Sequence, residues 1–455
     1  MAFLIGGANS AADTGYNVDN SCRFNDGDSP SMNKTASSGN TQHGTFSAWV
    51  KRGPTGDEHR VINAFIDGNN FTSIAFRTDD TIEIIHQDSG STTYRKITTA
   101  VYRDPAAWMH LCVIFDLDDG TAEDRVKLFV NGTRVTVFGT NTNPGDASKT
   151  MDYNNSSATL NIGQMETDNY FDGYMAEVVW IDGLALAATS FGEFDEDSPT
   201  IFKPIDVSGL TFGTNGFYLD FEDSANLGND ANGGTDLTES NLAATDQATD
   251  TPTNNFTTLN PLDHNNVTFS EGNLKGSCGS SGTCRSTMAV NKGKWYWEFK
   301  YIDPEGFHGI RATHLGVTDN TFSVKIFGLN DPIEAHINGS QNDLTGRDNM
   351  SDNDILNFAL DMDNNRFAIG QNGAWDNGSA FSGTTLNYHS ITGGHYYSPQ
   401  IATGSGTGRV CEVNFGSPSF AITSGNADAN GYGNFEFAVP SGFFSLCSKN
   451  LAEYG

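Results

Sequence analysis

The sequence predicts an all-β protein in which a polar connector joins two β-sandwich domains. Apolar and polar residues alternate with a period of two in many short runs, which is typical of strands with one buried face. The chain is also rich in turn formers and aromatic residues, with 50 Gly, 31 Phe, 14 Tyr and 6 Trp in 455 residues. Between the two alternating halves, Asn, Asp, Thr and Gly dominate residues 206–260. The two domains are therefore expected at residues 1–205 and 261–455.

The first half reads as an antiparallel meander. Phe46, Ala48 and Val50 share one face of an early strand. Later strands are predicted at residues 61–65, 73–76, 81–85, 108–115, 126–130, 160–162 and 174–181. Asn131-Gly132 is the strongest hairpin signal, because both residue types accept the positive φ of a type I′ turn. Residues 184–194, with the sequence LALAATSFGEF, permit a short helix. Strands with one apolar face bury it against another sheet, so we expect two packed sheets.

The connector at residues 206–260 has few large apolar residues and one predicted strand, at residues 216–221. Beyond it, alternation returns at residues 294–301, 354–361, 366–369, 396–402 and 409–415. A second β-sandwich is therefore expected at residues 261–455.

The charge excludes several classes of partner. The chain has 56 acidic and 25 basic residues, for a formal net charge of −31. Phosphate backbones and anionic membranes both require clustered Lys and Arg, so neither nucleic acid nor a membrane surface is expected as a partner. No apolar run reaches the roughly 18 residues of a membrane helix, and no secretory signal is evident. We expect synthesis and folding in a cytoplasm.

Six cysteines in a chain of this length are too few for a disulfide scaffold, and several lie in strand-like runs. We expect buried thiols for most of them. Cys278 and Cys284 flank the polar segment CGSSGTC, and the sequence leaves open whether they form a disulfide in an oxidising medium.

Catalytic signatures are missing from the sequence. Serine-nucleophile elbows, metalloprotease His pairs, phosphate-binding glycine loops and Cys-x-x-Cys pairs are all absent. Retaining glucanases place two carboxylates on one strand, but the acidic run at residues 193–197 precedes Ser198-Pro199 and reads as a loop. Asp116 and Asp118 lead into a turn, which explains them more simply. The sequence therefore predicts a protein that is not an enzyme.

Two known domain families resemble the two halves. The first half is similar to laminin-G-like (LamG), concanavalin-like jelly rolls through FSAWVKRG from Phe46, WMHLCVIFD from Trp108, VKLFVNGT from Val126, LNIGQ from Leu160 and FDGYMAEVVWIDG from Phe171. The second half resembles SPRY domains through GKWYWEFKY from Gly293, HLGVTD from His314, DILNFALDMDNNRFAIGQNGAW from Asp354 and YYSPQIATGSG from Tyr396. Both resemblances imply β-sandwiches that bind glycans or proteins.

Other segments resemble virion proteins of tailed phages, especially phages of marine and aquatic bacteria. These segments are GTNGFYLDFEDSANLGNDANG from Gly213, LAATDQATDTPTNNFTTLNPL from Leu242 and GYGNFEFAVPSGFFSLCSKNL from Gly431. The resemblance implies a location on the virion surface, after synthesis in the host cytoplasm. It also implies other capsid or tail proteins as partners, and self-association into a homo-oligomer.

Calcium is the one candidate cofactor, because carboxylate and amide oxygens suit hard cations and fill the loops of this chain. LamG-like domains often carry such a site at one rim, which the resemblance adds to the argument. The candidate ligands are Asp67, Asn69 and Asn70 in one hairpin, and Asp168, Asn169 and Asp172 in another. Asp and Asn also suit plain turns, so the spacing leaves both interpretations open.

A second candidate site is the hairpin tip around Trp375. This residue follows Asn372-Gly373 and precedes Asp376, so its ring is expected to point outward, where it could stack on a sugar. SPRY domains bind through such loops, although the family often has a packed aromatic residue at this position. Trp375, Asn372 and Asp376 are the predicted ligand-binding residues.

These observations lead to one main hypothesis and two alternatives. The main hypothesis is a non-enzymatic structural protein on the surface of a tailed-phage virion, as a head decoration or a short tail appendage, with glycan or protein binding through sandwich loops. The first alternative is a host-recognition adhesin or tail fibre that binds bacterial surface polysaccharide. The second is a polysaccharide depolymerase, for which the sequence offers no catalytic pair.

Overall fold

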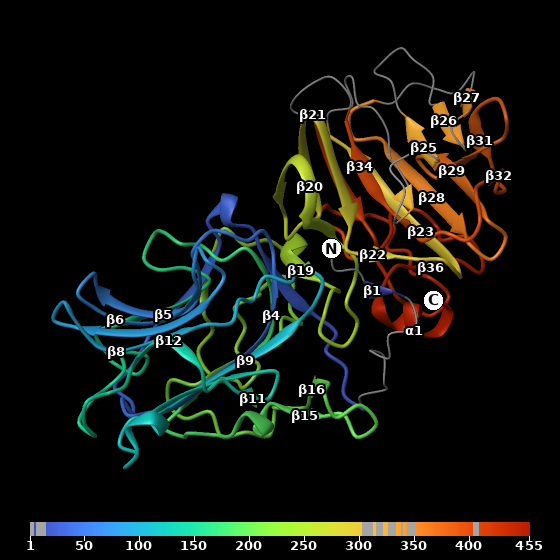
Figure 1. Ribbon diagram of the computed structural model, residues 1–455. Helices are drawn as coiled ribbons and strands as arrows, with labels where there is room; N and C mark the ends of the chain where they lie inside the picture. The colour runs from blue at the N-terminus through green and yellow to red at the C-terminus, as the bar shows by residue number, and fades with distance from the viewer. Residues whose placement is uncertain are drawn as a thin grey trace. The chain divides into compact units, whose positions relative to one another are not determined.

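The computed structural model describes residues 15–302, 351–403 and 409–455, together with the backbone of short strands at residues 4–5, 313–314, 322–325, 334–337 and 340–343. Residues 315–319 of the HLGVTD motif lie outside the described residues. The chain divides into a first unit, residues 12–253, and a second unit, residues 1–11 and 254–455. Strands form most of the regular structure in both units, which confirms the predicted all-β fold class (Figure 1).

Two eight-stranded sheets form the first unit. We call them the front sheet and the back sheet. The front sheet runs in the order β11 (Thr133–Arg134), β10 (Val126–Val130), β9 (Met109–Asp116), β4 (His43–Arg52), β14 (Gly173–Asp182), β2 (Ser21–Phe24), β19 (Gln247–Ala248), with β17 (Phe217–Leu219) also paired to β14. The back sheet runs β12 (Phe138–Thr142), β8 (Ser91–Thr98), β7 (Ile82–Asp88), β6 (Asn70–Phe76), β5 (His59–Asp67), β13 (Thr159–Ile162), β3 (Ser31–Thr35), β18 (Thr238–Ser240).

The alternation seen in the sequence separates two apolar layers in the first unit. Along β14, Val178 and Trp180 belong to the main core, whose members come from both sheets. Val179 and Ile181 point to the other face of the front sheet and pack in a smaller cluster with Phe212. A two-stranded ribbon, β15 (Gly192–Phe194) and β16 (Phe202–Pro204), lies in the chain between β14 and β17.

Residues 206–253 contribute to both sheets of the first unit. Strand β17 pairs with β14, β18 pairs with β3 and β19 pairs with β2. The segment also supplies fully buried core side chains, among them Phe217, Leu219 and Phe221. The predicted strand at residues 216–221 is present as β17.

The second unit contains one large sheet, two small ones and a helix. The large sheet has eleven strands in the order β20 (Leu259–Ser270), β21 (Lys275–Ser286), β35 (Arg409–Asn414), β23 (Lys294–Tyr301), β28 (Ile355–Asp361), β29 (Arg366–Gln371), β30 (Ala374–Asp376), β31 (Phe381–Gly383), with β32 (His389–Ser390), β34 (Gln400–Ala402) and β36 (Phe444–Ser445) paired alongside. The remaining elements are β1 (Leu4–Ile5) with β22 (Met288–Ala289), β24 (Thr313–His314) with β33 (Tyr397–Ser398), the ribbon β25 (Phe322–Lys325), β26 (Glu334–Ile337), β27 (Ser340–Asp343), and α1 (Ser448–Tyr454).

A buried carboxylate on the large sheet binds the C-terminal segment through hydrogen bonds. Glu298 on β23 is fully buried and accepts hydrogen bonds from the backbone N–H groups of Glu436 and Phe437, at 3.0 and 2.8 Å. Tyr296 and Phe435 pack edge to face beside it, with ring centroids 5.0 Å apart. The segment therefore covers one face of the sheet and excludes water from it.

Two details of secondary structure differ from the sequence predictions. The expected helix at residues 184–194 is wrong, because the chain there makes one 3₁₀ turn at Ala188–Ser190 and continues as strand β15. Helix α1 has no counterpart among the predicted elements. Within the described residues, no helix combines the length and apolar composition needed to cross a membrane. All six cysteines are buried free thiols, as expected for most of them.

Candidate functional site

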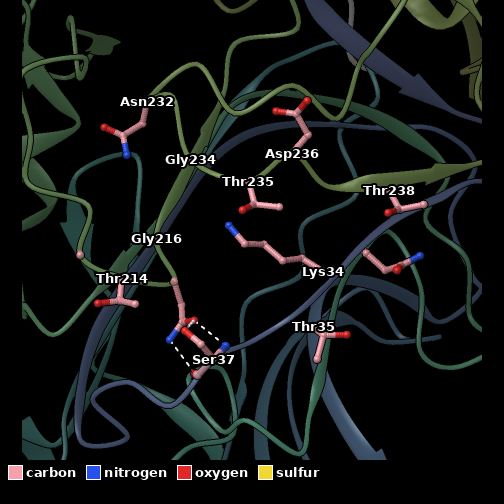
Figure 2. A pocket seen from close by; sticks show the side chains of 13 residues that line it. Lys34, Thr35, Ser37, Thr214, Gly216, Asn232, Gly234, Thr235, Asp236 and Thr238 are labelled. Atoms are coloured by element: carbon pink, nitrogen blue, oxygen red, sulfur yellow. Dashed lines mark hydrogen bonds between the residues drawn. The ribbon is translucent and has the colours of Figure 1, made fainter.

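A polar pocket of about 430 Å³ opens in the first unit beside strand β3. Three stretches line it, which come from β3 and its continuation, from the turn before β17 and from the loop before β18 (Figure 2). The lining residues are Asn33, Lys34, Thr35, Ser37, Gly213, Thr214, Asn215, Gly216, Asn232, Gly234, Thr235, Asp236 and Thr238. A cavity of this size accommodates a small organic ligand.

Glycines and a buried amide shape the turn at residues 213–216. Gly213 has a φ of +81°, and a side chain on Gly216 would collide with the carbonyl oxygen of Phe212. Asn215 is buried and binds the segment that follows β3, since its Oδ1 accepts from the Ser37 N–H and hydroxyl, each at 2.8 Å. Its backbone N–H donates to Asp182 Oδ2 at 3.1 Å. This wall of the pocket is therefore fixed before any ligand binds.

The opposite wall is a loop held by carboxylates. Asp230 Oδ1 accepts from the backbone N–H groups of Tyr218 and Asn232, at 3.0 and 3.1 Å. Asp236 Oδ1 accepts from the Asp230 N–H at 3.0 Å, and its Oδ2 accepts from Asn226 Nδ2 at 2.9 Å. The loop is consequently ordered by its own acidic residues.

Lys34 is the cationic side chain of the pocket. It is half-buried, and its Nζ lies 5.8 Å from the centre of the Phe217 ring. Burial lowers the pKa of the Lys34 ammonium, and the nearby carboxylates of Asp230 and Asp236 oppose this shift. Figure 2 shows the Lys34 side chain reaching into the middle of the pocket, whereas the carboxylate of Asp236 turns away from it.

The chemistry of the lining is that of a hydroxyl-binding surface. Five residues offer hydroxyl groups, three offer amides, and Asp236 is the one carboxylate among the lining residues. Such groups form hydrogen bonds with polyhydroxylated ligands in both directions. Acid–base hydrolysis of a glycosidic bond needs two carboxylates that face each other, and this lining does not supply such a pair.

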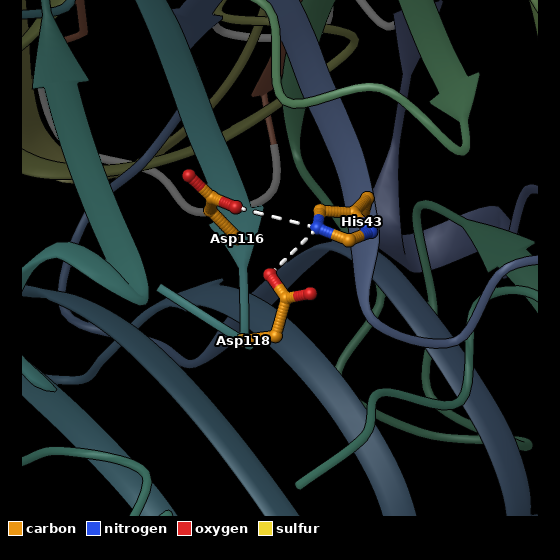
Figure 3. Close-up of side chains that lie close together, drawn as sticks. All are labelled: His43, Asp116 and Asp118. Atoms are coloured by element: carbon orange, nitrogen blue, oxygen red, sulfur yellow. Dashed lines mark hydrogen bonds and ion pairs between the residues drawn. The ribbon is translucent and has the colours of Figure 1, made fainter. Parts of the chain in front are cut away.

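A second cluster lies at the rim of the first unit, where β4 begins and β9 ends. His43 Nε2 is 2.8 Å from Asp118 Oδ1 and 3.4 Å from Asp116 Oδ1 (Figure 3). Their ligand atoms all lie within 4.8 Å of one another, which is the spacing of a metal-binding group. However, Lys127 Nζ is 3.6 Å from Asp116 Oδ2, so a protein cation already neutralises part of this charge. The sequence alone predicts Asp116 and Asp118 as turn residues and gives no connection with His43.

The first predicted calcium loop is a turn closed by its own side chains. Both carboxylate oxygens of Asp67 accept from Asn70 Nδ2, at 2.8 and 3.0 Å, and Oδ1 also accepts from the Asn69 N–H. These hydrogen bonds lower the pKa of the Asp67 carboxyl. The amide group of Asn70 thus offers donors to Asp67, whereas a cation needs oxygens. Calcium binding at this loop stays a prediction.

Residues of the second predicted calcium loop also have other partners in the fold. Asp168 Oδ1 accepts from the Asn169 N–H at 2.8 Å, and Asp168 also pairs with Met165 through the backbone. Asp172 is buried near Arg52, whose guanidinium charge it helps to stabilise. A cation at this loop would therefore compete with Arg52 for Asp172, and the site stays a prediction.

The predicted binding tip of the second unit faces inward. Trp375 is 9% exposed and packs edge to face on Tyr296, so the expectation that its ring points outward is wrong. Asp376 is fully buried and accepts from His389 Nε2 at 3.0 Å. Asn372 Nδ2 donates to Asp354 Oδ1 at 2.7 Å. These contacts give all three residues structural partners, and their role in ligand binding stays a prediction.

Sequence reasoning missed the pocket because its walls lie far apart in the chain. Lys34 and Ser37 precede most of the first unit, whereas Thr214 and Asp236 fall in the segment that the sequence predicts to be a connector. The available signal was that segment's dense Gly, Asn and Thr content, together with its few large apolar residues. Such a composition suits tight loops that pack on a sandwich as well as it suits a linker.

Comparison with protein families identifies the fold of the first unit. A family model described as Laminin_G_3, of the concanavalin A-like lectin/glucanases superfamily, matches residues 25–189. This match confirms the predicted LamG-like domain. Pocket residues 213–238 lie outside the matched segment. A search of curated proteins finds no relative of the sequence.

Solved structures that resemble parts of this chain include a SPRY domain, a pentraxin and a laminin region. The SPRY domain of human HERC1 is 15% identical, with a TM-score of 0.28, and covers 34% of this chain and 96% of its own. A heptameric SAP-like pentraxin from Limulus polyphemus is 17% identical, with a TM-score of 0.28, and covers 37% and 78%. The LG1-3 region of the laminin α2 chain is 8% identical, with a TM-score of 0.30, and covers 87% and 59%.

Proposed function

We propose that this chain is a non-enzymatic glycan-binding protein, and that the pocket beside β3 is its binding site. The observation that carries the proposal is the pocket's lining of hydroxyl, amide and ammonium groups on a concanavalin-like lectin/glucanase fold. These groups match the alternating donors and acceptors of a sugar ring. Asn215 and Asp230 order the walls in advance, which reduces the entropy lost when a ligand binds.

A glycan array probed with the full chain tests this proposal, with two matched variants. Thr235 lies exposed in the pocket, and Thr235→Trp would fill it without disturbing the core. Thr121 is exposed in a turn outside the pocket, so Thr121→Trp is the control. We expect wild type and the control to bind the same glycans, and the pocket variant to lose them. Equal binding by all three proteins would place the site elsewhere.

We further propose that the protein works on the surface of a tailed-phage virion. Support comes from the sequence segments that resemble phage virion proteins, and from the presence of two units, of which one can attach to the particle. Capsid or tail proteins would then be its partners, and self-association would give several copies. Mass spectrometry of purified virions should detect the chain, and its absence from the particle would exclude this location.

Among the two virion roles, the pocket favours the adhesin over a purely structural decoration. An adhesin must bind bacterial surface polysaccharide, and soluble chain should then block adsorption of the phage. A depolymerase would additionally release new reducing ends from that polysaccharide. We expect adsorption to be blocked without release of reducing ends, because Asp236 is the pocket's one carboxylate.

A further inference from the structure

The charges inside the pocket bear on which sugars it prefers, provided that the pocket binds glycans as proposed above. Two charged side chains line it, Lys34 and Asp236. Asp236 has its carboxylate occupied by Asn226 and by the backbone of Asp230. In contrast, the Lys34 ammonium forms no hydrogen bond and no ion pair with any of the described residues.

Lys34 therefore has three unused N–H donors in a place where water is partly excluded. The carboxylate of Asp230 stands behind the pocket wall, only 2% exposed, and its Oδ2 has no donor among the described residues. Gly234 separates this oxygen from the pocket, since a side chain there would collide with it. Asp230 and Asp236 stabilise the charged form of Lys34 electrostatically without forming hydrogen bonds with it.

We propose that the pocket selects a sugar residue that carries a carboxylate, such as a uronic acid, and that Lys34 binds this group. A ligand carboxylate would accept charge-assisted hydrogen bonds from the ammonium, which are stronger than those that a neutral hydroxyl accepts. The hydroxyl groups of Thr214 and Thr235 also line the pocket and can bind the rest of the ring. This chemistry distinguishes acidic sugars from neutral ones of the same shape.

The test compares uronate oligosaccharides with their carboxyl-reduced counterparts, in which a neutral –CH₂OH group replaces each carboxylate. Binding of each to the full chain is measured by calorimetry at about 0.15 M salt, where general repulsion by the acidic protein is screened beyond roughly 8 Å. We expect a uronate form to bind about tenfold or more tightly than its reduced counterpart. Lys34→Met should abolish this difference and leave the weaker binding of the reduced form.

Lys149→Met is the matched control, because it removes the same charge from a loop outside the pocket. It should bind as the wild type does. Equal affinity for both forms of the sugar, or an unchanged preference in Lys34→Met, would overturn the assignment to Lys34 and leave the proposed function intact. If neither the uronates nor any neutral glycan on the array binds, the proposed function fails as well.

Discussion

Glu177 is a buried carboxyl group at an irregular point of strand β14. Its φ is +50°, and the pairing of β14 with β4 shifts register between Ala176 and Val179. Tyr218 and Tyr16 donate hydrogen bonds to Glu177 Oε2, at 2.9 and 3.0 Å. Burial raises the pKa of the Glu177 carboxyl to about 7, although the two tyrosines oppose the shift. The group therefore changes its charge near neutral pH.

The raised pKa gives the first unit a defined pH dependence. The folded state holds this proton more tightly than the unfolded state, so the contribution of Glu177 to stability is full below about pH 4.5 and is lost as the pH rises through about 7. The full difference is about 3 kcal/mol, because one pKa unit corresponds to about 1.4 kcal/mol. Glu177→Gln should lose this slope and exceed the wild type in stability at pH 8. Urea unfolding of both proteins between pH 4.5 and 8 measures the difference, and parallel curves would contradict the prediction.

Lys51 and Asp250 form a fully buried ion pair in the first unit. Their side chains meet at 2.6 Å, and Trp108 Nε1 donates to the second carboxylate oxygen at 2.9 Å. Lys51 lies on β4 and Asp250 follows β19, so the pair fixes residues 248–251 against the front sheet. A buried pair of this kind tolerates the loss of both charges better than the loss of one.

Lys51→Met should therefore destabilise the first unit by about 3–5 kcal/mol, because it leaves the Asp250 charge without its ion pair. The double variant Lys51→Met/Asp250→Asn keeps an acceptor for Trp108 and should recover much of that loss. Thermal unfolding of the two variants and the wild type checks this order. A double variant that is no more stable than the single one would show that packing of the lysine, rather than charge, dominates.

At this scale the sequence predicts turns better than it predicts exposure. The turn at Asn372-Gly373 is present, with φ values of +49° and +80°. Trp375 nevertheless faces inward, because it packs in a buried cluster with Tyr296 and with Phe435 from the C-terminal segment. Similarly, no local pattern reveals that Lys34 and Asp236 line the same pocket. Burial depends on contacts between distant segments, which spacing along the chain does not encode.

The hairpin between β10 and β11 is an element whose sequence and structure agree. Val130 pairs with Thr133 across a two-residue loop, and Asn131 and Gly132 have φ values of +48° and +69°. Gly132 also lies against the buried ring of Phe202 on β16, with no room for a side chain. The turn therefore reverses the chain and also forms a close contact with the β15–β16 ribbon.

Gly132→Ala should cost about 2–3 kcal/mol, from the left-handed backbone and from the collision with Phe202. Gly120 offers a matched control, since it lies in an exposed turn without a positive φ, and a β-carbon added there would meet open space. Gly120→Ala should leave the free energy of unfolding within about 0.5 kcal/mol of the wild type. Equal effects of the two substitutions in chemical denaturation would contradict the role assigned to the turn.

Elements that depend on tertiary contacts were predicted less well. Residues 184–194 have a helical spacing of alanines, but Phe191 is buried against the front sheet and Gly192 fits closely against Phe202. These contacts favour an extended chain over a helix. Strands β18 and β19 have only three and two residues, too few for any periodicity to be read.

On the scale of the whole molecule, each unit has its own sheets and its own buried clusters. Residues 12–253 contain both sheets of the first unit and its main core. We expect this fragment to fold alone and to unfold cooperatively, with a midpoint close to that of the same transition in the full chain. Circular dichroism during heating tests this, and a fragment without a cooperative transition would show that the unit depends on the rest of the chain.

The surface carries the acidic excess behind the net charge of −31, although side chains of both signs are buried. Several basic side chains of the first unit are at most 1% exposed, namely Arg23, Lys51, Arg52 and Lys96. These cations are used in internal contacts, such as the pair of Lys51 with Asp250. Acidic side chains such as Asp172, Glu298 and Asp376 are buried as well, so the surface keeps the acidic excess of the composition, which disfavours non-specific adhesion to other acidic polymers.

Strand β1 has a consequence for the order in which the chain is made and folded. Its residues Leu4 and Ile5 pair with Met288 and Ala289, which also belong to the second unit. In the chain, the first unit is therefore inserted between residues 1–11 and 254–455 of the second unit. At a synthesis rate of roughly 5–20 residues per second, strand β22 leaves the ribosome tens of seconds after β1, and β1 has no pairing partner until then. Residues 12–253 have all been synthesised by then. We therefore expect the second unit to assemble last, and the nascent chain to carry β1 unpaired beside an already folded concanavalin-like unit.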